Sequence, residues 1–175
     1  TVVKDYDEAL NVYFALTGTY STSINKLIKI TKSEINLSPL QTIIYNVLNS
    51  DDSYNVLIDV AAYLINDSNI DIVSTISNIE GYKDRYMVYI DSNIDETGNL
   101  STQKSVLYNG NTFSYKNETY KTDELFIYYS QQNTIGIDIK QPAILKGLII
   151  IDDWNTYTQV SQAIYRCRKL NIGHT

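Results

Sequence analysis

The hydrophobic residues of this chain fall into short runs separated by polar stretches. A short apolar run bounded by turn residues is typical of a buried strand. Such runs lie at residues 12–16, 56–58, 86–90, 125–129 and 147–151. The run at 56–58 fits either a strand or a strand that continues into a short helix, and residues 23–30 fit a short helix or a strand.

Other stretches space their apolar residues as a helix does. Ser38 and Pro39 favour a helix start, since serine caps the first turn and proline lacks only an N–H that has no partner there. The apolar positions that follow are Leu40, Ile43, Ile44, Val47 and Leu48. Ser68 can cap a second helix that ends near Gly81. Its apolar stripe consists of Ile72, Val73, Ile76 and Ile79.

A β-hairpin is predicted around Asn109 and Gly110, because both central positions of its tight turn need a positive φ. Its strands cover residues 105–108 and 112–115. Strands that alternate with helices favour an α/β fold. We therefore expect a mostly parallel sheet with helices on both faces and an inserted β-hairpin.

Length, charge and cysteine content narrow the class of protein. A chain of 175 residues has the size of one domain, and its net charge of −6 gives it no basic surplus for binding phosphates. The single cysteine, Cys167, and single histidine exclude an internal disulfide or a Cys/His zinc site. No apolar run approaches the roughly 20 residues of a membrane span. We expect an intracellular protein, cytoplasmic or nuclear, with no metal ligands of its own and no membrane contact.

A polar loop after the run at 125–129 is the first candidate for chemistry. It contains Thr134, Gly136 and Asp138 at the carboxyl end of a predicted strand, where parallel sheets gather their ligands. A hydroxyl, an accessible backbone and a carboxylate suit contact with a ribose or a phosphodiester. A glycine-containing turn with a capping aspartate explains the same residues, and such turns are common.

A basic helix end is the second candidate. Thr156 or Thr158 can cap a helix whose later polar residues are Gln162, Arg166, Arg168 and Lys169. The planar fork of arginine suits phosphate at the edge of an α/β sheet. A solvated last turn, where cations interact favourably with the helix dipole, explains the same residues.

Three short segments, taken in order, resemble motifs of superfamily 2 helicases and translocases. Leu16-Thr17-Gly18-Thr19 resembles motif III, at the end of the first RecA-like domain. Thr134-Ile-Gly136-Ile-Asp138, with Pro142 following, resembles motif V. Gln162-Ala-Ile-Tyr-Arg166-Cys-Arg168 resembles motif VI, whose arginines act as the arginine finger in that family.

A closer resemblance is to the helicase-like segment of very large eukaryotic proteins of poorly defined function. Residues 128–139 and 162–173 are similar to its Thr-x-Gly-Thr-Asp-Leu loop and its Gln-Ala-x-Met-Arg-Met-Arg-Lys-Leu-Gly helix. Members of that family are often labelled ubiquitinyl hydrolases. Nothing in the chain supports a thiol protease, and we interpret Cys167 and His174 as packing and surface residues.

The chain departs from the helicase pattern in two respects. Motif VI usually has a glycine before its first arginine and a second arginine three residues later, whereas here Tyr165 precedes Arg166 and Lys169 holds the later position. The chain also lacks a GxxxxGK[ST] phosphate loop (Walker A) and an acidic Walker B strand.

The resemblance implies a RecA-like fold in which residues 1–22 end the first RecA-like domain and residues 23–175 form the second, truncated at its C-terminus. The chain would then be a piece of a longer protein. ATP with Mg²⁺ would lie between the two domains and be bound mainly by the preceding one. Arg166 first, and Arg168 second, would stabilise charge at the γ-phosphate, with Gln162 orienting water or phosphate.

The resemblance also implies roles for the remaining motif residues. The nucleotide contacts would be Gly136, Asp138 and Lys169; the coupling or nucleic-acid contacts would be Thr17, Thr19 and Thr134. The partners implied are the preceding RecA-like domain and RNA or DNA. Without Walker A and B, we expect the chain alone to be inactive towards ATP. The alternative is a non-catalytic RecA-like interaction or scaffold module, which the acidic charge and the unusual motif VI favour.

Overall fold

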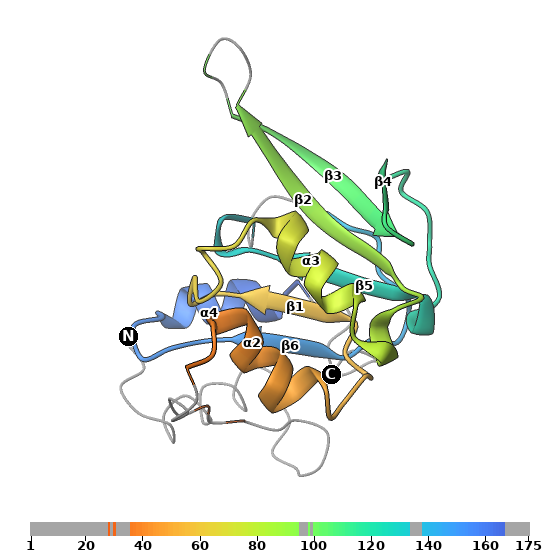
Figure 1. The fold of residues 1–175 in the computed structure, drawn as a ribbon. Helices are drawn as coiled ribbons and strands as arrows, with labels where there is room; N and C mark the ends of the chain where they lie inside the picture. The colour runs from red at the N-terminus through yellow and green to blue at the C-terminus, as the bar shows by residue number, and fades with distance from the viewer. Residues whose placement is uncertain are drawn as a thin grey trace.

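A six-stranded mixed sheet forms the centre of an α/β fold (Figure 1). The structure, a computed structural model, describes residues 28, 30, 36–94, 98, 100–133 and 138–166. The strands are β1 (Val56–Asp59), β2 (Tyr86–Ile94), β3 (Leu100–Tyr108), β4 (Asn111–Ser114), β5 (Leu125–Tyr129) and β6 (Gly147–Ile150). Their order is β4-β3-β2-β5-β1-β6, in which β2, β5, β1 and β6 are parallel and β3 and β4 antiparallel.

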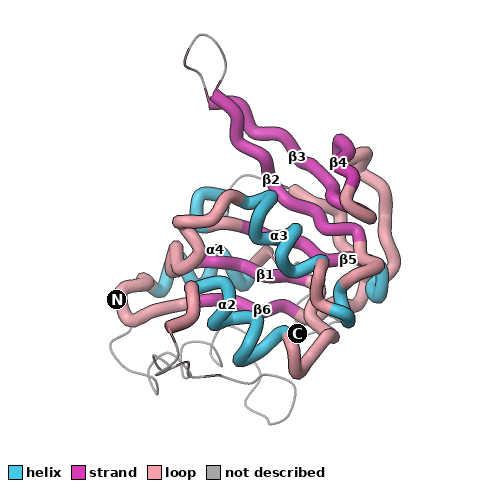
Figure 2. Tube along the Cα trace, viewed as in Figure 1, coloured by secondary structure: helices cyan, strands magenta, loops and turns pink. Residues whose placement is uncertain are grey.

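Helices cover both faces of the sheet (Figure 2). On one face lie α2 (Pro39–Ile43), a π-helical turn (Ile44–Leu48) and α3 (Asn69–Ser77). On the other lies α4 (Tyr157–Ile164), whose Ala163 joins the second core cluster. The short 3₁₀ turns are Glu80–Tyr82, Thr122–Glu124 and Gln131–Asn133. The predicted mostly parallel sheet with helices on both faces is confirmed.

The two central strands carry the core. Every residue of β1 and β5 is buried, and alternate side chains point to opposite faces. Leu57, Phe126 and Tyr128 pack towards α2 and α3, whereas Val56 and Ile127 pack in the cluster that includes α4. Continuous apolar runs are what a parallel sheet covered on both faces requires.

The local sequence signals mark the observed helix starts and the hairpin turn, whereas the helix predicted to end near Gly81 ends at Ser77. Ser38 caps α2 in a capping box with Gln41, and Ser68 caps α3 by accepting a bond from the Asp71 N–H. The Asn109–Gly110 turn joins β3 to β4, with φ of 49° and 74°. The run at 56–58 is a strand only, because the chain turns after Asp59 instead of continuing into a helix.

Some predictions fall outside the described residues. These are the strand at 12–16, the turn that follows it, and the division of the chain after residue 22. Of the segment 23–30, Ile28 and Ile30 are described, and both pack against the face that carries α2 and α3.

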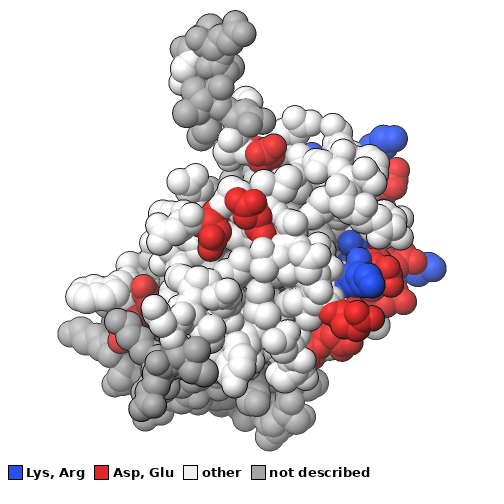
Figure 3. Space-filling model, viewed as in Figure 1, with Lys and Arg blue, Asp and Glu red and all other residues white. Residues whose placement is uncertain are grey.

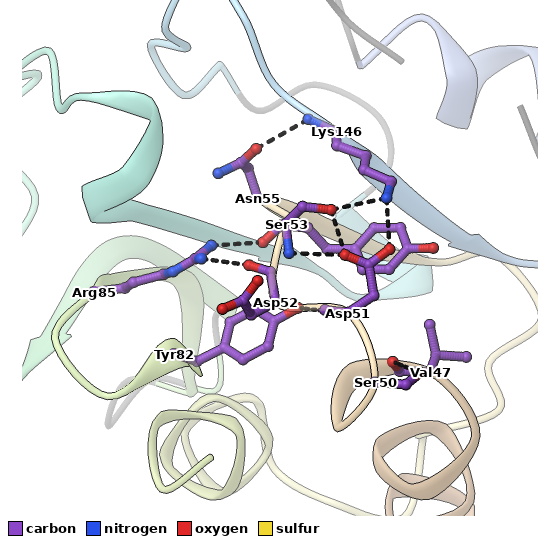
Figure 4. A network of polar contacts seen from close by, with 10 residues as sticks. Val47, Ser50, Asp51, Asp52, Ser53, Asn55, Tyr82, Arg85 and Lys146 are labelled. Carbon is purple, nitrogen blue, oxygen red and sulfur yellow. Dashed lines mark hydrogen bonds and ion pairs between the residues drawn. The ribbon is translucent and has the colours of Figure 1, made fainter. Parts of the chain in front are cut away.

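A network of polar contacts closes the amino edge of the parallel strands (Figure 4). Lys146 Nζ lies 2.6 Å from Asp51 Oδ2, 2.8 Å from Ser53 Oγ, and 4.4 Å from the ring centre of Tyr54. Arg85, directly before β2, approaches the same segment and donates to the carbonyls of Asp52 and Tyr54. The two cations therefore hold the chain that enters β1 against the starts of β2 and β6.

The ionised state of Asp51 is stabilised in this network. Burial raises the pKa of Asp51, but hydrogen bonds from Lys146 and Ser53 outweigh it and hold the pKa at about 2, below the ordinary 3.8. A carboxyl whose pKa is lowered on folding contributes stability above its unfolded pKa and loses it as the pH falls. The Asp51 contribution is therefore present above about pH 4 and disappears towards pH 2.

We expect Asp51→Asn to make the melting temperature depend less on pH at acidic pH. The variant should melt about 2–4 °C below the wild type at pH 7, as suits a partly exposed ion pair, and the difference should shrink between pH 4 and pH 2. Thermal unfolding across this pH range measures it. Asp123→Asn, at an exposed position, is the control. A difference in melting temperature between Asp51→Asn and the wild type that stays constant from pH 7 to pH 2 would contradict the role given to the Asp51 carboxylate.

Candidate functional site

The loops after β1, β5 and β6 meet at the carboxyl edge of the parallel strands. The Val60 N–H donates to the Ile150 carbonyl (3.0 Å). The Val60 carbonyl accepts from Asn155 Nδ2 (3.2 Å) and Gln131 Nε2 (3.3 Å). One backbone carbonyl thus joins the three loops, and this is the edge at which ligands of parallel sheets bind.

Asp59 is a buried carboxylate at the end of β1, with 1% of its surface exposed. Its two oxygens accept from the N–H groups of Tyr63 (2.9 Å) and Leu64 (2.8 Å). Burial raises the pKa of Asp59, the two N–H donors oppose the rise, and the charge of Asp152 adds to it. Because both oxygens are occupied within the loop, Asp59 fixes the turn that leaves β1.

The loop after β6 is a tight turn that presents Trp154. The Asp152 N–H donates to Asn155 Oδ1 (2.9 Å), and the Trp154 N–H donates to Asp152 Oδ1 (3.0 Å). Thr156 then caps α4 in a capping box with Gln159. The indole of Trp154 stays 84% exposed, although tryptophan is mostly buried in folded proteins.

Arg166 lies on the β5 side of this edge. Its guanidinium carbon is 6.0 Å from the ring centre of Tyr129, the last residue of β5, and its carbonyl accepts from Gln141 Nε2 (2.7 Å). The helix α4 ends at Ile164, so Arg166 follows it in a turn and does not continue the helix face of Gln162. The structure therefore brings the motif VI-like Arg166 next to the segment that follows the motif V-like loop.

The other described motif residues are both exposed. Gln162 is exposed on α4. Asp138 is exposed near Tyr115: burial raises the pKa of that tyrosine, and the charge of Asp138 adds to the rise. The remaining predicted site residues lie outside the described residues: Thr17, Thr19, Thr134, Gly136, Arg168 and Lys169. Their roles stay predictions.

Sequence reasoning missed the residues that organise this edge, Asp59, Asn155 and Trp154. The available signal was a polar residue directly after each buried run. The contact of Asn155 with Val60 could not be inferred from the sequence, because the two residues are 95 positions apart.

Other parts of the described chain offer no better candidate. A hollow of about 690 Å³ lies between the π-helical turn and the end of α3, but it contains none of the predicted site residues. No group of three His, Cys, Asp or Glu among the described residues is arranged to hold a metal ion. The described helices include none with the length and hydrophobicity to cross a bilayer.

Comparisons of the chain with known protein families, with curated proteins and with solved structures find no match. Function must therefore be argued from the residues and geometry of the carboxyl edge.

We expect Asn155→Ala to destabilise the fold by about 1–3 kcal/mol, because it leaves the Asp152 N–H without its acceptor and removes a donor from the buried Val60 carbonyl. Chemical unfolding measures the loss. Asn66→Ala removes an exposed amide from the neighbouring loop and should change stability by less than about 0.5 kcal/mol. Equal effects of the two substitutions would show that Asn155 does not tie the loops together.

Proposed function

We propose that residues 23–175 form the second RecA-like domain of a superfamily 2 helicase-like ATPase, with residues 1–22 ending the first, and that the chain supplies arginine to an ATP site between the two domains. The observation that carries the proposal is the position of Arg166. Its side chain lies against the end of β5, and Gln141 ties its backbone to the segment that follows the motif V-like loop. The parallel order β2-β5-β1-β6 supports the proposal, because this pair lies at the carboxyl edge, where parallel sheets usually bind ligands.

The proposed division of labour follows from what the chain contains. No glycine in the sequence is followed by lysine, so the chain has no phosphate loop of the GxxxxGK[ST] type. The preceding domain would hold the phosphates and Mg²⁺, which together position the γ-phosphate and neutralise part of its charge. Arg166 would contribute a fixed positive charge where negative charge develops, with Arg168 in support. Gln162 would orient water or phosphate, and the polymer acted on would be RNA, DNA or protein.

The residues of the carboxyl edge suit a bound anion on the β5 side and not on the β6 side. Arg166 is half-buried beside β5, which suits a phosphate. On the β6 side, Asp152 and Asp153 are exposed, and the segment 147–165 contains no lysine, arginine or histidine. A polyphosphate would be repelled there. This acidic side favours the second candidate function, a RecA-like interaction module without ATPase activity.

Titration of the purified chain with Mg²⁺–ATP, followed by amide NMR, tests the first candidate. We expect no ATP turnover, and weak binding in the millimolar range that shifts the amides of Arg166, Ala163 and residues 138–141. Arg166→Ala should weaken this binding about tenfold or more, because it removes a charged contact to phosphate. Lys83→Ala, which removes an exposed cation near the amino edge, should leave it unchanged.

The outcomes separate the two candidates. The absence of amide shifts up to about 10 mM Mg²⁺–ATP would favour the interaction module. Shifts centred on Lys146 and Arg85 would place any nucleotide at the wrong edge. ATP turnover that Arg166→Ala abolishes would contradict the division of labour between two domains.

A further inference from the structure

The carboxyl edge exposes apolar side chains beside its acidic residues. Trp154 is 84% exposed, Ile65 67%, Tyr157 42% and Tyr63 39%. Single exposed apolar residues are ordinary, but tryptophan and tyrosine that gather at one place are typical of interaction surfaces. None of these four residues is used by the proposed ATP site.

Two neighbouring loops supply these side chains. Tyr63 and Ile65 follow β1, whereas Trp154 and Tyr157 follow β6, and the two strands are paired in parallel. The Ala61 N–H donates to the Ile150 carbonyl (3.2 Å), and Asn155 Nδ2 donates to Val60. The loops are thus fixed to each other before any partner arrives, which reduces the entropy that binding would cost.

The charge around these loops has one sign. Residues 56–82 and 147–165 contain no lysine, arginine or histidine. They contain six acidic residues. Asp67, Asp71, Asp152 and Asp153 lie in these loops or directly after them, whereas Asp59 is buried and Glu80 follows α3 near Asp52. Two ion pairs among the described residues, Lys121–Glu124 and Lys146–Asp51, involve none of these six. On the face shown in Figure 3, Lys and Arg lie towards the right, away from the ends of β1 and β6.

We infer that this surface binds a cationic protein segment, with an arginine of the partner stacked on Trp154 and paired with Asp152 or Asp153. We call it the Trp154 surface, and it consists of Tyr63, Ile65, Asp152, Asp153, Trp154 and Tyr157. A guanidinium is planar and weakly hydrated, so it can lie on an indole face while its N–H groups reach a carboxylate.

Charge decides between a protein and a nucleic acid as the partner. Bases also stack on tryptophan, but a nucleic acid brings its phosphates, and binding normally needs lysine or arginine to neutralise them. The Trp154 surface supplies only carboxylates. A cationic protein segment is attracted by the same charges, and this inference requires no nucleotide, so it goes beyond the ATP proposal.

Trp154 is the single tryptophan of the chain, so its intrinsic fluorescence reports directly on the surface. The probe is an octa-arginine peptide added to the full chain, with octa-lysine, octa-glutamate and a single-stranded oligonucleotide for comparison. We expect octa-arginine to change the Trp154 emission saturably, octa-lysine to bind more weakly, and added salt to weaken both. Octa-glutamate and the oligonucleotide should leave the emission unchanged.

Variants measured with a fluorescently labelled octa-arginine peptide locate the binding. Trp154→Ala should weaken it about tenfold, and Trp154→Phe, which keeps a ring, should restore part of the loss. Asp152→Asn/Asp153→Asn should weaken it about three- to tenfold, since asparagine keeps the acceptor for the Trp154 N–H. Glu118→Gln/Asp123→Asn makes the same change of net charge at exposed positions elsewhere and should weaken it by less than about twofold.

Three results would overturn the inference. Equal weakening by the two charge-matched double variants would mean that the peptide senses only net charge. Unchanged binding by Trp154→Ala, with a circular dichroism spectrum that shows the native fold, would remove the stacking contact. Oligonucleotide binding that depends on Trp154 would assign the surface to nucleic acid. None of these results bears on the Mg²⁺–ATP titration, whose readout is at Arg166, so the two proposals fail separately.

Discussion

The burial of β1 and β5 on both faces is the constraint on which the rest of the structure depends. Water cannot reach the ends of these strands, so the backbone groups there must find partners within the protein. At the amino end, Asn55 donates to the Leu125 carbonyl and accepts from the Lys146 N–H. At the carboxyl end, Asp59 and Asn155 serve the same purpose. Polar residues at strand ends are therefore required by the fold before any function is considered.

The charged and aromatic side chains near the carboxyl edge divide it into two parts. Beside β5 the protein presents a cation, Arg166, next to an aromatic ring. Beside β1 and β6 it presents carboxylates and the exposed indole of Trp154. Carboxylates repel a polyanion unless a cation lies between them, so the part beside β1 and β6 adds no direct attraction for a phosphate. The acidic part is thus better suited to a protein partner, whichever candidate function the cationic part supports.

Local signals in the sequence predicted local structure. The caps at Ser38, Ser68 and Thr156 and the turn at Asn109–Gly110 involve partners within a few residues, so their types alone determine the geometry. The carboxyl edge could not be predicted in this way. The order of the strands, the contact of Asn155 with Val60 and the exposure of Trp154 depend on segments far apart in the chain. The segments that suggested a helicase-like ATPase lie at residues 16–19, 134–138 and 162–168, and of their residues only Asp138 and 162–166 are described.

With a nucleotide beside β5 and a cationic segment on the Trp154 surface, as proposed, each ligand should change the affinity for the other in a predictable direction. On these two proposals, Asp152 and Asp153 would repel a phosphate bound at the same edge, because like charges repel. A cationic partner segment on the Trp154 surface would neutralise that repulsion. Binding of the partner would then strengthen binding of the nucleotide, and the nucleotide would strengthen the partner by the same factor, since coupling between two sites is reciprocal. An acidic rim beside an arginine is in that case a means of making one ligand depend on the other.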